Sequence, residues 1–287
     1  MPLFDIRDVN FTKLKSLKME HLVNFCREFS VPTSGDAAGM IRNSLLAFDN
    51  GRITSQQINT YIKNLHRQLK DAEMRSTGAN HQAIINELNR VGSHIWGMVQ
   101  GAVDQHIQAN YVRKYFRYDD ILQAVRSTLY QSIESYTLCT WYNHWSTEIL
   151  EDLISVSPNV VPIIKKVKGV DIIWNEQPVD IKVTNLPKEW FGDGHNIDDA
   201  INNPVFVSEY LYRLQGAQRF GDDNRLFIII YDKRNPAESW KIKRDYNLIK
   251  QSVENFFNHS TQLDPVNFRY GSTQYSAYSK ILFIIKE

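Results

Sequence analysis

The chain has 287 residues, of which 43% are hydrophobic and 23% are charged. This is the composition of an ordinary globular protein, long enough for one large domain or two smaller ones with a sizeable core. The 33 Lys and Arg residues nearly balance the 32 Asp and Glu residues, so the formal net charge is +1. A uniformly basic protein is therefore excluded, and any surface for a polyanion must be local.

Cysteine spacing and hydropathy indicate where such a chain would work. The two cysteines, Cys26 and Cys139, have no CxxC neighbour or other zinc spacing, so we expect neither a disulfide nor structural zinc. The first residues lack a positively charged leader followed by an apolar run, and no stretch has the apolar length of a membrane span. These features predict a soluble protein of the bacterial cytoplasm that does not enter a membrane.

The first half of the chain is predicted to be helical. Apolar periodicity indicates two short helices between residues 14 and 48, a third over 53–72, and two long ones over about 81–110 and 119–154. The long helices contain aromatic residues at helical spacing, which is typical of a core rather than of a cofactor site. These residues include Trp96, Tyr130, Tyr136, Trp141, Tyr142 and Trp145.

The pattern changes after Ser157-Pro158, where short β-branched runs predict strands. The second half is expected to contain three strands, then a polar loop, a helix, a strand buried on both faces, a helix and a last strand. In chain order these elements are residues 160–164, 170–174, 179–184, 188–203, 205–220, 226–231, 244–258 and 280–286. The fold class expected is mixed α and β (α+β or α/β), with a helical N-terminal region before an αβββαβ core around a mixed sheet.

Two carboxylates and a lysine interrupt the apolar strands of this second half. Asp171 follows Val170, and Asp180 and Lys182 lie in the run PVDIKVT. Because side chains two apart on a strand point to the same face, Asp180 and Lys182 share a face, and a hairpin can bring Asp171 near them. Two adjacent carboxylates are costly to bury unless cations neutralise them. Mg²⁺, with Mn²⁺ as a substitute, suits such oxygen ligands, and this arrangement fits metal-assisted phosphodiester hydrolysis.

The stretch GVDIIWNEQPVDIKVT resembles the core of the PD-(D/E)xK, or restriction-endonuclease-like, nucleases. The resemblance implies that Asp171 is the first acid, Asp180 the second acid and Lys182 the lysine, with Val170 in place of the proline of the motif. The family also has a glutamate on the helix before the first core strand. Glu151 corresponds to it best, and Glu148 and Asp152 are the alternatives. Without the resemblance, Asp180 and Lys182 would be an ion pair on an edge strand and Asp171 a turn cap.

A second stretch, LKSLKMEHLVNFCREFSVPTSGDAAGMIRNSLL, is similar to the SAP motif, a helix-turn-helix DNA-binding module. The family usually has a lysine soon after the glycine, whereas Asp36 follows Gly35 here. Basic residues in or near this module, and others before the predicted catalytic strand, could contact a DNA backbone through sequence-independent phosphate contacts. They are Lys13, Lys15, Lys18, Arg42, Lys165 and Lys166. The alternative is that they belong to solvated faces.

A further basic and aromatic cluster lies between the two long predicted helices. It consists of Tyr111, Arg113, Lys114, Tyr115, Phe116, Arg117 and Tyr118. Such a cluster could follow a nucleic-acid backbone. The spacing of the aromatic residues favours the other interpretation, in which they belong to the core.

The two resemblances together imply a SAP-like module over residues 1–50, a helical region over 51–145 and a nuclease core over 146–287. They imply a Mg²⁺-dependent DNA endonuclease of the type II restriction or defence kind. Cleavage of both strands of duplex DNA requires two sites, so a homodimer is expected. The alternatives are a DNA-binding or partner-binding protein with an inactive nuclease-like core, and a DNA-repair or RNA-directed nuclease.

Overall fold

The computed structural model describes residues 4–92, 102–214 and 224–287. The chain divides into two compact units, of which one joins Met1–Ala79 with Glu151–Glu287 and the other is Asn80–Leu150. The first unit therefore combines the N-terminal helices with the second half of the chain. The sequence had suggested divisions near residues 50 and 145 instead.

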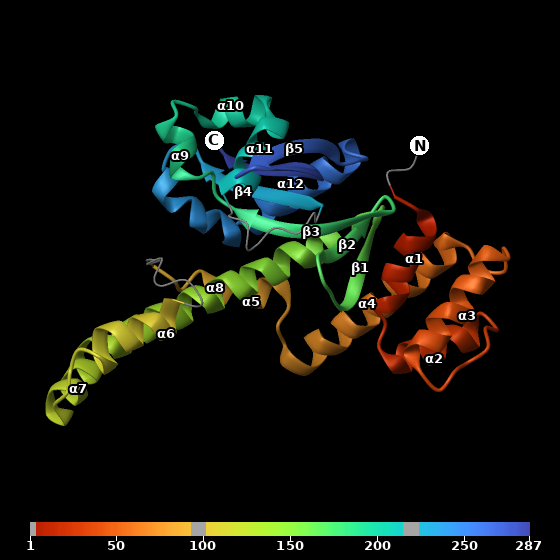
Figure 1. Ribbon diagram of the computed structural model, residues 1–287, viewed down its shortest axis with the longest axis horizontal. Coiled ribbons are helices and arrows are strands. Elements are labelled where there is room, and N and C mark those ends of the chain that lie inside the picture. Colours follow the sequence, from red (N-terminus) through yellow and green to blue (C-terminus); the bar gives the residue numbers. More distant parts are fainter. Residues whose placement is uncertain (1–3, 93–101, 215–223) are drawn as a thin grey trace. The chain divides into compact units, whose positions relative to one another are not determined.

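Four helices form the N-terminal part of the first unit: α1 (Ile6–Lys15), α2 (Met19–Glu28), α3 (Ala37–Asp49) and α4 (Ser55–Thr77) (Figure 1). The helix predicted from residue 14 is α2, which begins at Met19, whereas α1 was not predicted. The Asp5 carboxylate accepts a hydrogen bond from the Arg7 amide and caps the start of α1. The helix predicted from residue 53 is present as α4, and Thr54 forms a capping box with Gln57.

The apolar faces of these helices share one core with the start of the sheet. Leu14, Leu22, Phe25 and Met40 are fully buried. They belong to the same cluster as residues of two strands, Val161 and Ile173 among them. The N-terminal helices are thus not a separate module but a cover for one end of the sheet.

The sheet has six strands in the order β1-β2-β3-β4-β6-β5. They are β1 (Val160–Val167), β2 (Val170–Trp174), β3 (Gln177–Thr184), β4 (Arg225–Asp232), β5 (Asp264–Tyr270) and β6 (Thr273–Lys286). The β1-β2, β2-β3 and β5-β6 pairs are antiparallel, whereas β3-β4 and β4-β6 are parallel. The central strand β4 is buried along most of its length, as predicted.

Strand β5 was not predicted, and β6 begins seven residues before the predicted strand at 280–286. The two form a hairpin around Gly271, whose φ of 58° suits a residue without Cβ. Pro265 weakens the strand pattern, but β5 lies at the edge of the sheet, where a missing amide hydrogen is tolerated.

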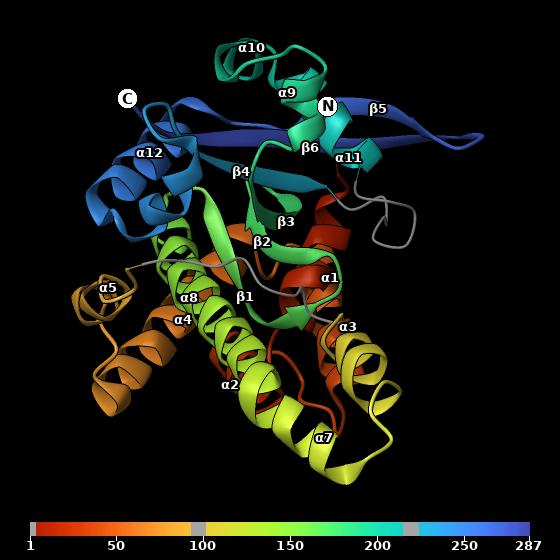
Figure 2. The same cartoon turned by 90° about the vertical axis from the view of Figure 1, so that its left-hand side faces the viewer.

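Helices cover both faces of the β4-β6-β5 part of the sheet (Figure 2). One face packs against α9 (Lys188–Gly192), α10 (Ile197–Asn202) and α11 (Pro204–Leu214). On the other side lie the 3₁₀ helix η4 (Pro236–Arg244) and α12 (Tyr246–His259). The prediction of a loop over 188–203 was wrong, since α9 and α10 occupy it and a capping box between Asn196 and Asp199 begins α10.

The second unit contains helical segments and the start of a long helix. They are α5 (His81–Leu88), α6 (Ala102–Ile107), the π-helical turn η1 (Gln108–Val112), α7 (Tyr118–Ala124), the π-helical turn η2 (Val125–Leu129) and α8 (Tyr130–Ser155). Most of the aromatic residues predicted as core are not fully buried. Tyr142 is buried, but Tyr130 is exposed and Trp141 is half-buried. Trp96 lies outside the described residues.

The structure confirms a mixed helix and strand fold with a mixed central sheet. Its core follows the predicted order of a helix, three strands and then alternating helices and strands, with β5 added. Within the described ranges, no helix is long and apolar enough to cross a membrane.

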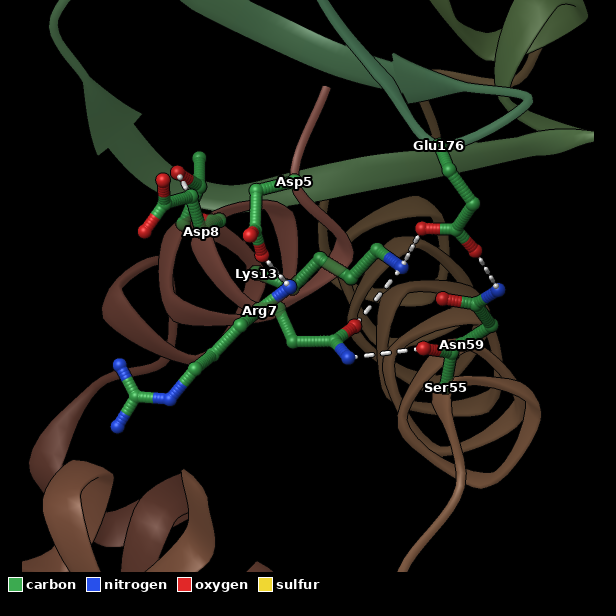
Figure 3. Close-up of polar contacts among 9 residues, drawn as sticks. Asp5, Arg7, Asp8, Lys13, Ser55, Asn59 and Glu176 are labelled. Carbon is green, nitrogen blue, oxygen red and sulfur yellow. Dashed lines mark hydrogen bonds and ion pairs between the residues drawn. The ribbon is translucent and has the colours of Figure 1, made fainter. Parts of the chain in front are cut away.

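An ion pair between a buried lysine and a partly exposed glutamate joins the N-terminal helices to the β2-β3 hairpin (Figure 3). The Lys13 side chain of α1 is 0% exposed, and its ammonium contacts the Glu176 carboxylate at the tip of the hairpin. Asn10 accepts a second hydrogen bond from Lys13 at 3.2 Å, and the Asn59 amide of α4 donates to Glu176 at 2.9 Å. Desolvation lowers the pKa of Lys13, and the nearby Glu176 carboxylate opposes that shift.

The same contacts hold a turn that its own residues disfavour. Asn175 and Glu176 have φ angles of 47° and 59°, the conformation of the two-residue turns that match the twist of a hairpin. A left-handed conformation costs a residue with Cβ about 1 kcal/mol, and Gly is the residue usually preferred in the second position. The side-chain contacts of Glu176 with α1 and α4 offset that cost.

We predict that Glu176→Ala lowers the free energy of unfolding by about 3 kcal/mol, because it leaves the Lys13 ammonium buried without its counter-charge. Equilibrium urea denaturation measures the loss. Lys13→Met combined with Glu176→Gln should recover part of it, since no buried charge remains. Glu254→Ala, which breaks an exposed ion pair with Lys250 on α12, is the control and should cost below about 0.5 kcal/mol. Equal losses of unfolding free energy for Glu176→Ala and Glu254→Ala would contradict the prediction.

Candidate metal and nucleic-acid site

Strand β3 changes its partner in the middle of its length, and the candidate site lies at that point. Residues 177–179 pair with β2, whereas residues 180–184 pair with β4. The Asp180 amide donates to the Asn224 carbonyl at 2.9 Å, on the β4 side. Backbone amides alternate in direction along a strand, so the next amide, that of Ile181, points to the side that β2 has left.

Asp171 satisfies this amide. Its Oδ2 accepts a hydrogen bond from the Ile181 amide at 2.8 Å. Ile172 pairs with Val179, and extending that register by one residue sets Asp171 opposite Asp180. Directly opposite residues of an antiparallel pair project to the same face, so the two carboxylates lie on one side of the sheet.

Asp180 has a cationic neighbour that the sequence did not indicate. Arg225, the first residue of β4, pairs in register with Asp180, and its Nε lies 3.6 Å from Asp180 Oδ2. The Arg225 side chain is buried, and its guanidinium carbon lies 5.5 Å from the ring centroid of Tyr212. The ion pair of Asp180 is therefore with Arg225, and not with Lys182 on an edge strand.

Lys182 is exposed two residues beyond Asp180, on the same face of β3. Within the described part of the chain its side chain forms no hydrogen bond or ion pair. Its ammonium is therefore accessible to an anion that approaches this face.

The face that carries these residues is covered at both ends and accessible between them. The N-terminal helices pack on it at β1 and β2, through Val161 and Ile173. Helix α11 and its neighbours pack on it at β4, through Phe227 and Ile229. Asp171 and Lys182 are exposed and Asp180 is partly exposed in the strip between these two clusters.

The helix acids predicted for the site are placed separately. Glu151 is exposed near the end of α8, and Asp152 forms an ion pair with Lys70 of α4 at 3.1 Å. Glu148 is half-buried in the second unit. Among the described residues, no group of three or more acidic, histidine or cysteine side chains is arranged to hold a metal ion. The structure thus brings together Asp171 and Asp180 but does not add Glu151 to them.

The two carboxylates nevertheless fit a magnesium ion. Asp171 uses Oδ2 for the Ile181 amide, and its Oδ1 has no partner among the described residues. Mg²⁺ characteristically takes one or two carboxylates and completes its octahedron with water and substrate phosphate oxygens. A pair of adjacent, accessible carboxylates satisfies that requirement without a third protein ligand.

Three of the basic residues predicted to contact DNA lie together. Lys15 of α1, Arg42 of α3 and Lys165 of β1 line one pocket of about 530 Å³, which Arg7 also lines. All four side chains are exposed, and Arg7 forms an ion pair with Asp49 at 3.1 Å. The apolar part of the lining includes Phe11, Leu17 and Ile41.

The other basic candidates differ from this group. Lys13 is buried in its ion pair with Glu176 and is not accessible to a phosphate. Lys18 and Lys166 are exposed but do not line the pocket. The apolar spacing of α1 could have identified Lys13 as inward-facing, because it falls between the buried Val9 and Leu17 at intervals of four residues.

We predict that Mn²⁺ stabilises the folded protein and that Asp171→Asn and Asp180→Asn each abolish most of this effect. An ion that binds only the folded state adds about 2.7 kcal/mol at a concentration one hundred times its Kd. Thermal unfolding across a Mn²⁺ titration measures it. Asp171→Asn keeps an oxygen for the Ile181 amide, so the variant should remain folded. Asp8→Asn, at an exposed acid of α1, is the control, and equal stabilisation of all four proteins would refute a metal site at this pair.

Comparisons of the chain with protein-family models, curated proteins and solved structures found no match.

Proposed function

We propose that the protein is a Mg²⁺-dependent DNA endonuclease of the type II restriction or defence kind, with a restriction-endonuclease-like core. The proposal rests on the accessible pair of carboxylates, Asp171 and Asp180. They lie at the point where β3 stops pairing with β2 and begins to pair with β4. Lys182 follows on the same face. The resemblance of this stretch to the PD-(D/E)xK motif supports the same chemistry.

Each residue of this set has a distinct task. Mg²⁺, when bound, would polarise the scissile phosphate and lower the pKa of a water molecule. Asp171 and Asp180 would supply the carboxylate oxygens for it. Lys182 would orient the attacking water and stabilise the negative charge that develops on the phosphate oxygens. The Arg225 Nε lies 3.6 Å from one oxygen of Asp180 and attracts this carboxylate toward β4.

Duplex DNA is the proposed substrate because the basic pocket belongs to the same compact unit as the carboxylates. Lys15, Arg42 and Lys165 converge there from three elements. Contacts of such side chains with phosphates position a duplex without reading its sequence. Cleavage of both strands requires two sites, so the active form would be a homodimer.

Two observations favour a second candidate function, a DNA-binding or partner-binding protein with an inactive core. The Asp180 carboxylate already has a cation, Arg225, at 3.6 Å, and Glu151 is not grouped with the other acids. A guanidinium can neutralise a carboxylate in place of a metal ion. In this case the protein would bind DNA but gain no stability from Mn²⁺ and cut nothing.

Asp180→Ala and Lys182→Met should each lower the rate of Mg²⁺-dependent plasmid cleavage by about 100-fold or more. Asp180→Ala removes a carboxylate that would bind the metal ion, and Lys182→Met removes the ammonium that would stabilise the developing negative charge. Gel electrophoresis of methylated and unmethylated plasmids, with an RNA substrate in parallel, measures the rates and the substrate class. Lys250→Met on α12 is the matched lysine control and should cut at the wild-type rate. Undiminished cutting by both site variants would exclude the proposed site.

Lys15→Glu combined with Arg42→Glu should weaken binding to any duplex and reduce the slope of log K against log salt by about 2, one for each lost phosphate contact. Fluorescence anisotropy at several salt concentrations, with Asp180→Ala in the background to prevent cutting, measures this. Lys250→Glu, which makes one such charge reversal on an exposed helix face, is the control and should leave the salt slope unchanged. An unchanged salt slope would exclude the pocket as a phosphate-binding surface.

A further inference from the structure

The helical segments between residues 102 and 138 in the second unit, which we call the arm, expose many large apolar side chains. Phe116 is 95% exposed, Tyr118 75% and Tyr130 67%. Four aliphatic residues of the arm are also exposed, namely Val112, Val125, Ile133 and Leu138. Single exposed apolar residues are normal on a protein surface, but a concentration of this kind marks an interaction site.

The arm has almost no core of its own. Among its residues whose burial is described, only Tyr111 and Leu129 are buried. A hydrogen bond of 3.0 Å between the Tyr111 hydroxyl and Thr128 Oγ1 joins η1 to η2. Helices in proteins gain most of their stability from packing of an apolar face, and two buried side chains supply little such packing. The arm therefore needs a partner surface to bury more.

The exposed and the partly buried residues of α8 within the arm lie on different sides of the helix. Tyr130 and Ile133 are three residues apart and share one side of the helix. The partly buried residues Ser132, Tyr136 and Cys139 follow each other at intervals of four and three and share another side. A helix with apolar residues on two sides packs in two directions.

The charges at the tip of the arm have opposite signs on successive segments. Arg113, Lys114 and Arg117 lie between η1 and α7, and Asp119 and Asp120 lie in the first turn of α7. All five are exposed, and none forms an ion pair within the described residues. Such a surface is complementary to itself, because a twofold axis can bring the basic segment of one copy to the acidic segment of the other.

We propose that the arm is a homodimer interface, in which two arms pack side by side around a twofold axis. Burial of the three exposed aromatic residues alone would remove on the order of 500 Å² from each copy. The exposed aliphatic residues that lie on the same side would add to this area, toward the roughly 800 Å² per partner of a standard interface. Nucleic acid is a poorer occupant, because the surface is apolar and carries both signs of charge.

This inference deepens the proposed function, because it names a surface for the homodimer that cleavage of both strands requires, and it can be tested without cleavage. If the chain dimerises through the arm but cuts no DNA, the interface stands and the proposed function fails. If it cuts DNA as a monomer, the interface fails.

Analytical ultracentrifugation of the full chain at micromolar concentrations tests the interface. The wild-type protein should sediment as a dimer, with twice the chain mass of 33.5 kDa. Phe116→Asp and Tyr118→Asp should each raise the dimer dissociation constant at least about tenfold, since each removes an exposed aromatic side chain from the contact. Circular dichroism checks that the variants remain folded. Val156→Asp, at an apolar residue 76% exposed outside the arm, is the control and should remain dimeric.

A charge exchange tests the twofold pairing directly. Arg113→Glu with Arg117→Glu, and separately Asp119→Lys with Asp120→Lys, should each give monomers, because like charges then meet across the axis. An equimolar mixture of the two variants should form a heterodimer. A monomeric wild-type chain, dimeric Phe116→Asp and Tyr118→Asp variants, or a mixture that stays monomeric would each overturn the proposal.

Discussion

The change of partner within β3 is the constraint around which the candidate site is built. A strand that pairs with β2 up to Val179 and with β4 from Asp180 leaves the Ile181 amide without a strand partner. The Asp171 carboxylate takes the place of a strand partner by accepting the hydrogen bond of this amide. The same hydrogen bond holds the Asp171 carboxylate where β2 and β3 separate, beside Asp180. The change of strand partner therefore creates a place where two acids lie together.

The position of this hairpin depends in turn on the ion pair of Lys13 and Glu176. The pair joins α1 to the tip of the hairpin, and Asn59 adds a contact from α4. Because the N-terminal helices share a core with β1 and β2, they pack in one unit with the sheet and do not form an independent module. The SAP-like segment accordingly presents its basic residues from a fixed surface, and Lys165 of β1 joins Lys15 and Arg42 there.

Basic and acidic residues are nearly equal in number over the whole chain, but they are unevenly distributed over its surface. Although the net charge is +1, four basic residues line one pocket, and the tip of the arm carries both positive and negative side chains. The first arrangement suits a polyanion, and the second suits a copy of itself. If both surfaces act as proposed, the two tasks of a double-strand nuclease, holding DNA and pairing two sites, are assigned to different units of the chain.

Local patterns in the sequence were sufficient for the helical first half, the three strands of the β1-β2-β3 meander and the buried strand β4, because apolar periodicity and turn residues act over a few positions. They also predicted Asp171, Asp180 and Lys182 as the candidate residues for metal-assisted chemistry, which stays a prediction. Only the tertiary structure placed Arg225 beside Asp180, buried Lys13 and exposed Phe116 and Tyr130. These outcomes depend on which distant segments pack together, and no local spacing contains that information.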